Sequence, residues 1–361
     1  MAEPAPSPAR HASRTHLLRG NRAFRSLCAS RAVSFTGDGI TTTALVLLVA
    51  ARALPVLAAL VAVAASLATV RNPAGSSLVP VLVDTAGRAP AYALFGLGRT
   101  LTLAVGPGLG GLLAALGGTR TALAADAATF VVSALLLRGL PAITPVRDPA
   151  AASGMWAEAA EGLRYVTAHR RILVLVLSLF LLVAFAAVDN VALVFLTGKA
   201  LRVGSAGYGL ASSAFGAGML LAALACTRLA RGRSPAALLI AAVAATGTGS
   251  VINGLAPVLT VVVAAQLIAG AGNAIENIGY STVVQELVPR QFLGRVFGTV
   301  GSVSQLGAAA AYVAGSFMVG LAGARVTFVL AGIGTFTVLP VLVPALIRWQ
   351  YWRRDRRPPQ R

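Results

Sequence analysis

Long apolar runs follow one another along almost the whole chain, and they are the feature that most limits its fold. A helix needs about 20 mostly apolar residues to cross the hydrocarbon core of a membrane. Ten segments come close to that length: 32–51, 53–70, 91–115, 120–138, 172–196, 207–229, 235–256, 258–284, 296–319 and 325–347. Only 11% of the residues are charged, well below the share in soluble domains. The sequence therefore predicts an all-α integral membrane protein, a polytopic bundle of about ten transmembrane helices.

The placement of arginine and lysine indicates the orientation of these helices, because cytoplasmic loops carry an excess of both. If the N-terminus is inside and every run spans, 25 of the 30 basic residues lie on the inner side and 5 on the outer side. Both termini are therefore expected in the cytoplasm, in a multi-pass protein of the inner or plasma membrane. The net charge of +19 is explained by this topology, so no nucleic-acid partner is predicted.

The same runs predict five regions along the chain. They are a basic cytoplasmic tail (1–31), an N-terminal bundle of four helices (32–138), a cytoplasmic linker (139–171), a C-terminal bundle of six helices (172–348) and a second basic tail (349–361). Within the linker, "MWAEAAEGLRYVTAHRR" (155–171) is expected to form a helix on the inner face.

A shift of 205 positions reveals an internal repeat, which is a signature of many secondary transporters. "NPAGSSLVPVLVD" (72–84) then falls on "NIGYSTVVQELVP" (277–289), and without any gap Gly118 meets Gly323 and Arg120 meets Arg325. The repeat also exposes a deficit. The interval from the acid in the first helix to the repeated segment is about 54 residues shorter in the N-terminal half than in the C-terminal half. That difference corresponds to two helices with their loops.

These segments resemble the major facilitator superfamily, and within it the bacterial branch that includes macrolide and enterobactin exporters. The similarity covers about 22–348. "SFTGDGITTTALVLLV" resembles the first helix of that branch, and "RNPAGSSLVPVLV" the end of its fourth. "GAGNAIENIGYSTVVQELVPRQFLGRVFG" (270–298) is similar to the tenth helix and the loop after it. The resemblance implies two pseudo-symmetric halves, of which the first lacks helices two and three and the signature loop between them.

The most polar stretch of any apolar run lies in the tenth-helix segment. At 100° per residue, its polar residues occupy one stripe of roughly 100°, formed by Gln266, Asn273, Glu276, Asn277 and Tyr280. Because a charge at bilayer depth is costly unless it faces protein or water, the stripe is expected to line a polar cavity between the halves. Glu276 either contacts substrate and couples protons there or forms an interhelical hydrogen bond that only holds the helix in place.

Two further helices carry acids that fit a substrate or proton pathway. Asp38 and Thr41 share one face of the first helix, and Asp189 with Asn190 lies in the middle of the 172–196 run. For Asp38 a cap or gate contact with a nearby arginine is the alternative, and for Asp189 a structural role is equally open. Asp126, near the outer end of its helix, is expected to be structural.

The segment "GPGLGG" (106–111) resembles the Gly-Pro motif of the antiporter fifth helix. Pro107 predicts a kink, and Gly106 and Gly110 form a small-xxx-small packing face with Gly111 beside it. The resemblance therefore implies an antiporter, in which substrate and protons are exchanged.

The remaining chemistry of the sequence points to gradient-driven transport. There is no phosphate-binding G-x-x-x-x-G-K-[ST] motif, no metal-ligand pattern among three histidines and two cysteines, and no nucleophile–base set. Neither an enzyme, a cofactor nor a metal site is predicted. Burial disfavours the charged form of a carboxyl group, so buried acids can take up a proton on one side and release it on the other.

The sequence therefore predicts proton-coupled efflux of a small amphipathic molecule, such as a drug, an antibiotic or a siderophore-like compound, by alternating access within the lipid bilayer. Two alternatives stay open. The chain can be a non-transporting remnant or scaffold, because of the missing helices, or a lipid flippase that differs only in substrate.

The predicted topology can be tested by labelling single cysteines in intact cells. A membrane-impermeant maleimide should reach a cysteine placed next to Lys199 and should not reach one placed next to Arg231, because only the first position is expected outside. The opposite pattern would show that the assigned orientation is wrong.

Overall fold

The computed structural model describes residues 21–49, 78–84, 87–138, 155–229 and 234–355. Every regular element in these ranges is a helix, which confirms the predicted all-α membrane fold. The chain divides into two compact units, Met1–Thr144 and Pro145–Arg361.

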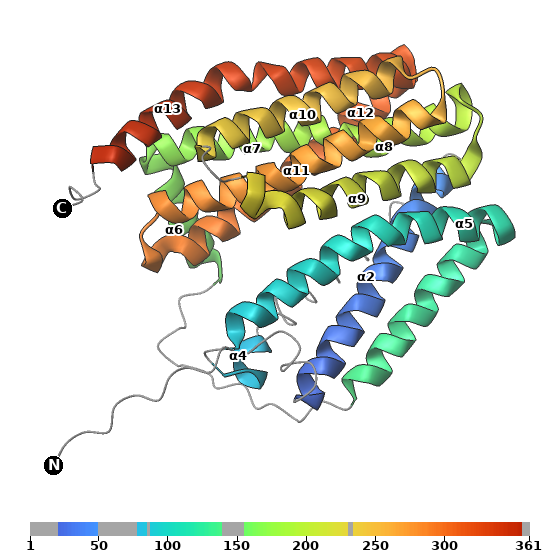
Figure 1. The fold of residues 1–361 in the computed structure, drawn as a ribbon, viewed down its shortest axis with the longest axis horizontal. Coiled ribbons are helices and arrows are strands. Elements are labelled where there is room, and N and C mark those ends of the chain that lie inside the picture. The colour runs from blue at the N-terminus through green and yellow to red at the C-terminus, as the bar shows by residue number, and fades with distance from the viewer. Residues whose placement is uncertain (1–20, 50–77, 85–86, 139–154, 230–233, 356–361) are drawn as a thin grey trace. The chain divides into compact units, whose positions relative to one another are not determined.

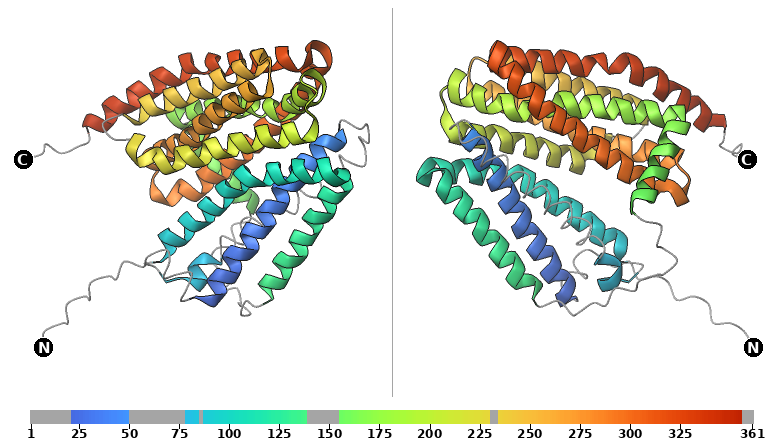
Figure 2. Two further views of the ribbon diagram at one scale, coloured as in Figure 1. Left: turned by 45° about the vertical axis from the view of Figure 1, so that its right-hand side comes forward. Right: turned by 180° about the vertical axis from the view of Figure 1, so that it is seen from behind.

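The N-terminal unit contains three described helices, α2 (Arg22–Val49), α4 (Val79–Leu82) and α5 (Arg88–Leu137). α2 packs along α5, whose two arms run beside it (Figures 1 and 2). Hydroxyl groups tie α2 to the second arm: Ser30 and Ser133, both buried, share a hydrogen bond of 2.6 Å, and the Ser26 hydroxyl donates to the carbonyl oxygen of Leu136. Such polar contacts between helices are a normal source of cohesion in membrane bundles.

The C-terminal unit is a bundle of helices, most of which run side by side (Figure 1). Its elements are α6 (Met155–Ala168), α7 (Arg170–Ala186), α8 (Val188–Phe195), the π-helical turn η2 (Leu196–Ala200), α9 (Gly204–Leu229), α10 (Pro235–Leu255), α11 (Leu259–Leu287), the 3₁₀ turn η3 (Arg290–Phe292), α12 (Leu293–Thr337) and α13 (Leu339–Asp355).

The short helix α6 corresponds to the helix expected in the linker. It is tied to α12 by an ion pair, in which Arg295 Nη1 lies 2.7 Å from Glu161 Oε1. The Tyr165 ring stacks on Phe292, with ring centroids 4.6 Å apart. These two contacts hold α6 against the start of α12.

Local sequence explains where α10 begins and how its end is satisfied. Ser234 is the N-cap and its hydroxyl accepts a hydrogen bond of 3.1 Å from the backbone N–H of Ala237, while proline occupies the first helical position. At the other end, Arg325 of α12 donates to the carbonyl oxygens of Gly254 and Ala256, at 3.3 and 2.7 Å. The guanidinium group therefore takes the place of water at carbonyl groups that have no partner in their own helix.

Glycines allow α10 to approach its neighbours closely. A Cβ atom at Gly249 would lie 2.8 Å from the Ala265 carbonyl oxygen of α11, and one at Gly272 would lie 2.6 Å from the Thr246 hydroxyl of α10. Since helices in lipid gain little from the hydrophobic effect, such close contact is a main source of their attraction. α10 is therefore fixed between α11 and α12.

The geometry within each unit repeats in the register that the sequence predicts. α5 begins at Arg88 and α12 at Leu293, which are 205 positions apart. Each helix is then broken by one glycine in the left-handed region, Gly118 with φ 75° and Gly323 with φ 78°. Two breaks of the same kind at equivalent positions support a true internal repeat.

Most of the predicted ranges lie on described helices, but fewer helical segments qualify as membrane spans, and α2 is not among those that do. Nine of the ten ranges fall on α2, on α5 before and after Gly118, on α7 with α8, on α9, α10 and α11, and on α12 with α13 before and after Gly323. By length and composition, six helical segments within the described residues can cross a membrane, and α12 with α13 forms one of them.

Several expectations concern residues that the structure does not describe. They are the tail before residue 21, the span at 53–70, residues 72–77 of the repeated segment, the linker residues 139–154 and the end of the C-terminal tail after residue 355.

The helix breaks can be tested by glycine replacement. Gly323→Ala should destabilise the protein by about 1–2 kcal/mol, because an L-residue in the left-handed region clashes with its own backbone, and nothing lies within 4 Å of the added Cβ atom. Gly118→Ala should behave alike. The measurement is the thermal unfolding midpoint in detergent.

The matched control is Gly320→Ala, three residues away in the same helix and also with open space around the added atom. With ordinary helical geometry, this change should stabilise the helix by about 0.5–1 kcal/mol. Equal effects at both positions would contradict the assigned strain.

Candidate functional site

The polar stripe on α11 meets two different environments. Glu276 is only 6% exposed, and its Oε1 accepts a hydrogen bond of 2.8 Å from the Thr246 hydroxyl of α10. Asn277, the next residue, is exposed and donates to the side-chain oxygen of Asn273 at 3.0 Å. The carboxyl group is therefore bound inside the C-terminal unit, whereas the two asparagines form a separate pair on a more open side.

Asp189 is bound in a similar way from another helix. It lies in the first turn of α8, and the Ser250 hydroxyl of α10 lies 3.2 Å from one carboxyl oxygen and 3.3 Å from the other. Its neighbour Asn190 is exposed. The structure thus brings the two predicted site acids, Asp189 and Glu276, onto α10, a helix from which the sequence predicted no site residue.

The residues on α10 that bind the acids had a signal in the sequence. "TGTGSVIN" (246–253) places Thr246, Ser250 and Asn253 at intervals of four and three in an otherwise apolar run, so they share one helix face. All three are at most 3% exposed. Threonine and serine alone are common in such helices, and only the facing acids give these hydroxyls a role.

Two other predicted residues of α11 are buried with a polar atom unpaired. The side-chain oxygen of Gln266 and the hydroxyl of Tyr280 have no hydrogen-bond partner among the described residues. Tyr280 and Asn277 line a small cavity of about 190 Å³ together with Ser281 of α11 and Ser304 of α12. The rest of its lining is apolar, from α7, α11 and α12. This cavity is smaller than a usual site for a drug-sized ligand, which has roughly 300–1,000 Å³.

In the N-terminal unit, Asp38 is half-buried on α2. Thr41 belongs to the same helix, but its side chain lies outside the described residues. Asp126, expected to be structural, is buried on the second arm of α5, so close to Gly37 of α2 that an added Cβ atom would overlap its carboxyl oxygen. The acid therefore lies at the contact between these two helices.

The Gly-Pro motif lies within the first arm of α5. The helix continues through Pro107, and the only non-helical backbone angles inside α5 belong to Gly118. Gly106, Gly110 and Gly111 are buried, as a packing face requires. The break that the structure places in this helix is therefore eleven residues beyond the proline.

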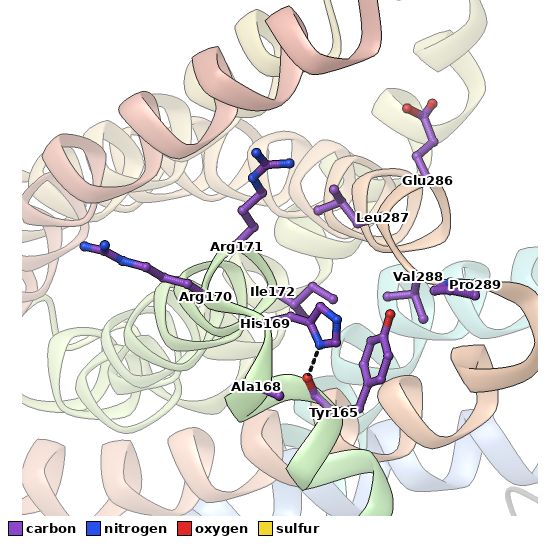
Figure 3. Close-up of a pocket in the computed structure, with 10 residues that line it drawn as sticks. All are labelled: Tyr165, Ala168, His169, Arg170, Arg171, Ile172, Glu286, Leu287, Val288 and Pro289. Atoms are coloured by element: carbon purple, nitrogen blue, oxygen red, sulfur yellow. Dashed lines mark hydrogen bonds between the residues drawn. The ribbon is translucent and has the colours of Figure 1, made fainter. Parts of the chain in front are cut away.

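A larger hollow of about 710 Å³ lies where α6, α7 and the end of α11 meet. Figure 3 shows Tyr165 and His169 close to Val288, with Arg170 and Glu286 extending away from them. His169 Nδ1 lies 2.8 Å from the carbonyl oxygen of Tyr165 in the preceding turn. The lining holds charges of both signs, so it does not select one class of ligand.

The arrangement offers carboxyl groups that can bind protons. Within the described residues, neither Asp189 nor Glu276 forms an ion pair, and no group of His, Cys, Asp and Glu is placed to hold a metal ion. Burial raises the pKa of the Cys28 thiol to about 11, against the opposing effect of Arg31, which leaves it a weak nucleophile at neutral pH.

Solved structures that share the fold are membrane transporters. A mutant of the nucleoside transporter NupG matches with a TM-score of 0.68 at 12% identity, covering 92% of this chain and 94% of that one. A bacterial homologue of the iron transporter ferroportin, in an inward-facing state, matches with a TM-score of 0.59 at 17% identity over 89% and 82% of the two chains. A bacterial homologue of the human lysosomal transporter Spinster gives 0.55 at 16% over 96% and 87%.

At these identities the structural likeness establishes the fold alone. No curated protein sequence matches the chain. The family model described as "Transmembrane secretion effector" matches residues 25–357, which is nearly the whole length. This chain therefore belongs to the transmembrane secretion effector family and is a membrane transporter with the major facilitator fold.

Proposed function

We propose that this protein is a proton-coupled exporter of a small amphipathic molecule that works by alternating access. The observation that carries the proposal is the pair of acids in the C-terminal unit, Asp189 and Glu276, each bonded to a hydroxyl group and neither paired with a cation among the described residues.

An acid in such a place is suited to coupling. A charge inside the bilayer is expensive unless it is paired or hydrated, and membrane acids therefore mark ion and proton pathways by default. Binding or release of a proton changes the charge of the site, so the two forms favour different surroundings. A proton can then shift a conformational equilibrium, provided that its affinity differs between the two states.

The cavity beside Tyr280 is too small to enclose a drug-sized molecule, and it is the chemistry of its lining that supports an amphipathic substrate. Its apolar wall, with an amide and hydroxyl groups at one side, suits a molecule with a hydrophobic body and a few polar groups. The structural neighbours include transporters named for nucleosides and for iron, and those substrates belong to those proteins. For this chain we propose a lipophilic, drug-like or siderophore-like compound.

One observation favours a second function, a membrane scaffold that does not transport. In the register of the repeat, Leu54 corresponds to Leu259, the first residue of α11. In the C-terminal unit, α9 and α10 lie between η2 and α11, whereas only residues 50–53 separate the end of α2 from Leu54. The N-terminal unit therefore has no sequence for two equivalent helices.

The exporter proposal predicts that Glu276→Gln abolishes export and preserves the fold. Glutamine keeps the shape and can still accept a hydrogen bond from Thr246, but it cannot bind and release a proton. In a host without its own efflux pumps, cells that produce the wild type should accumulate less ethidium, a lipophilic cation, than vector controls. Cells with the glutamine variant should match the vector.

The matched control is Thr335→Val, which removes a buried hydroxyl that bonds only within α12, to the Ala331 carbonyl oxygen. Its export should equal that of the wild type. Full export by Glu276→Gln would leave the residue a purely structural role. If the wild type failed to export ethidium and a panel of lipophilic compounds at normal expression, the scaffold function would be favoured.

A further prediction separates substrate contact from coupling. Asn277→Ala removes an exposed amide from the cavity side of α11, so it should change the ranking of exported compounds and leave the dependence on the proton gradient intact. The ranking is measured from accumulation, and the dependence from its response to a protonophore. Loss of the gradient dependence would contradict a substrate role for Asn277.

A further inference from the structure

One face of α10 binds both Asp189 and Glu276. Thr246 donates to Glu276 of α11 at 2.8 Å, and Ser250, one helical turn later, lies 3.2 Å from Asp189 of α8. Both hydroxyls are at most 3% exposed. Residues four apart on a helix have Cβ atoms about 5–6 Å apart, a separation that a single water molecule can bridge between two hydroxyl groups.

The polar face extends beyond the two hydroxyls at both ends. Asn253, 0% exposed, lies on the same side of α10, and both polar atoms of its side chain have no partner among the described residues. On α11, one turn after Glu276, the buried Tyr280 hydroxyl is also unpaired and borders the cavity beside α7. A buried polar group without a partner costs stability, so a water molecule at any of these groups would be stabilising.

We propose that Asp189, Ser250, Thr246 and Glu276 form a single proton relay that runs along α10 inside the C-terminal unit. The inference rests on the proposed proton-coupled function and adds its route. Asn253 stands at one end of the relay and Tyr280 at the other. The hydroxyls of α10 are part of the relay, not merely supports for the acids.

The transfer balances without any other reactant. The protonated carboxyl group of Asp189 gives its proton to the Ser250 oxygen, while the hydrogen of that hydroxyl passes through the bridging water to the Thr246 oxygen. Thr246 in turn gives its own hydrogen to the Glu276 carboxylate. Asp189 ends as a carboxylate and Glu276 as an acid, and both hydroxyls keep one hydrogen each. Rotation of the hydroxyl groups restores the starting arrangement.

The charged groups on the surrounding helices do not interrupt this route. α10 carries no ionisable side chain between Pro235 and Leu255. On α12, Arg295 is paired with Glu161 and Arg325 donates to carbonyl oxygens at the end of α10.

The helices of the same unit that surround α10 carry further titratable groups. They are Tyr280 and Glu286 on α11, Tyr312 on α12, Tyr208, Cys226 and Arg228 on α9, Arg170 and Arg171 at the start of α7, Lys199 on η2, and Tyr351, Arg348, Arg353, Arg354 and Asp355 on α13. Of these, Tyr280 is the group beside the relay.

Infrared titration of the full chain in lipid nanodiscs tests the relay without any substrate. Protonated carboxyl groups give a separate C=O band, and Asp189→Asn and Glu276→Gln identify the contribution of each acid. If the acids share one relay, their titrations are coupled. Asp189→Asn should then move the midpoint of the Glu276 band by about one pH unit, and by reciprocity Glu276→Gln should move that of Asp189 by a similar amount.

The hydroxyls provide the decisive controls. Thr246→Val keeps the shape and removes the hydroxyl, so the Glu276 midpoint should no longer respond to Asp189→Asn. Thr246→Ser should restore the response, and Thr335→Val should leave it unchanged, because that hydroxyl bonds only within α12. If one acid variant does not fold, the reciprocal measurement in the other still decides.

Independent titration of the two bands, unchanged by either substitution, would overturn the relay. A response of the bands to sodium ions at constant pH would also overturn it, in favour of a metal-cation site. Export is a separate readout. Coupled bands in a protein that exports nothing would support the relay and contradict the exporter function. Export by a protein with independent bands would support the exporter function and contradict the relay.

Discussion

The close approach of α10 to α11 is the contact on which the chemistry of the C-terminal unit depends. A Cβ atom at Gly272 would lie 2.6 Å from the Thr246 hydroxyl and 2.7 Å from the Ala242 carbonyl oxygen. Any side chain there would move α10 away and lengthen the 2.8 Å bond between Thr246 and Glu276. Gly272 therefore decides whether the buried acid Glu276 meets a donor or is left unpaired, which is costly in a membrane.

The internal repeat shows which structural features the two units share. The same break recurs at Gly118 and Gly323, and the arginine two residues later is retained as well. Arg325 satisfies the last carbonyl groups of α10. Its counterpart Arg120 is exposed, and the described residues of that unit include no helix whose end it caps in the way that Arg325 caps α10.

Much of the fold follows from the sequence, because long apolar runs and turn residues are local signals. The helices and the equivalence of Gly118 with Gly323 were predictable in this way. The hydrogen-bond partners of Asp189 and Glu276 were not predictable from the sequence. Thr246 also donates to its own helix, at Ala242, as Thr335 does at Ala331, and sequence alone does not distinguish a hydroxyl that bonds only within its helix from one that reaches a neighbouring acid. Which of these two hydrogen-bond patterns a hydroxyl adopts depends on how closely the two helices pack.

Proton binding and transport are therefore separable properties of this chain. The acids and hydroxyls that we assign to the relay belong to α8, α10 and α11, all within one compact unit, so the relay includes no residue of the N-terminal unit. Alternating access in this fold instead requires the two halves to rock against each other around a shared site. Proton binding at the proposed relay therefore needs one unit only, whereas converting that binding into movement of a substrate needs both.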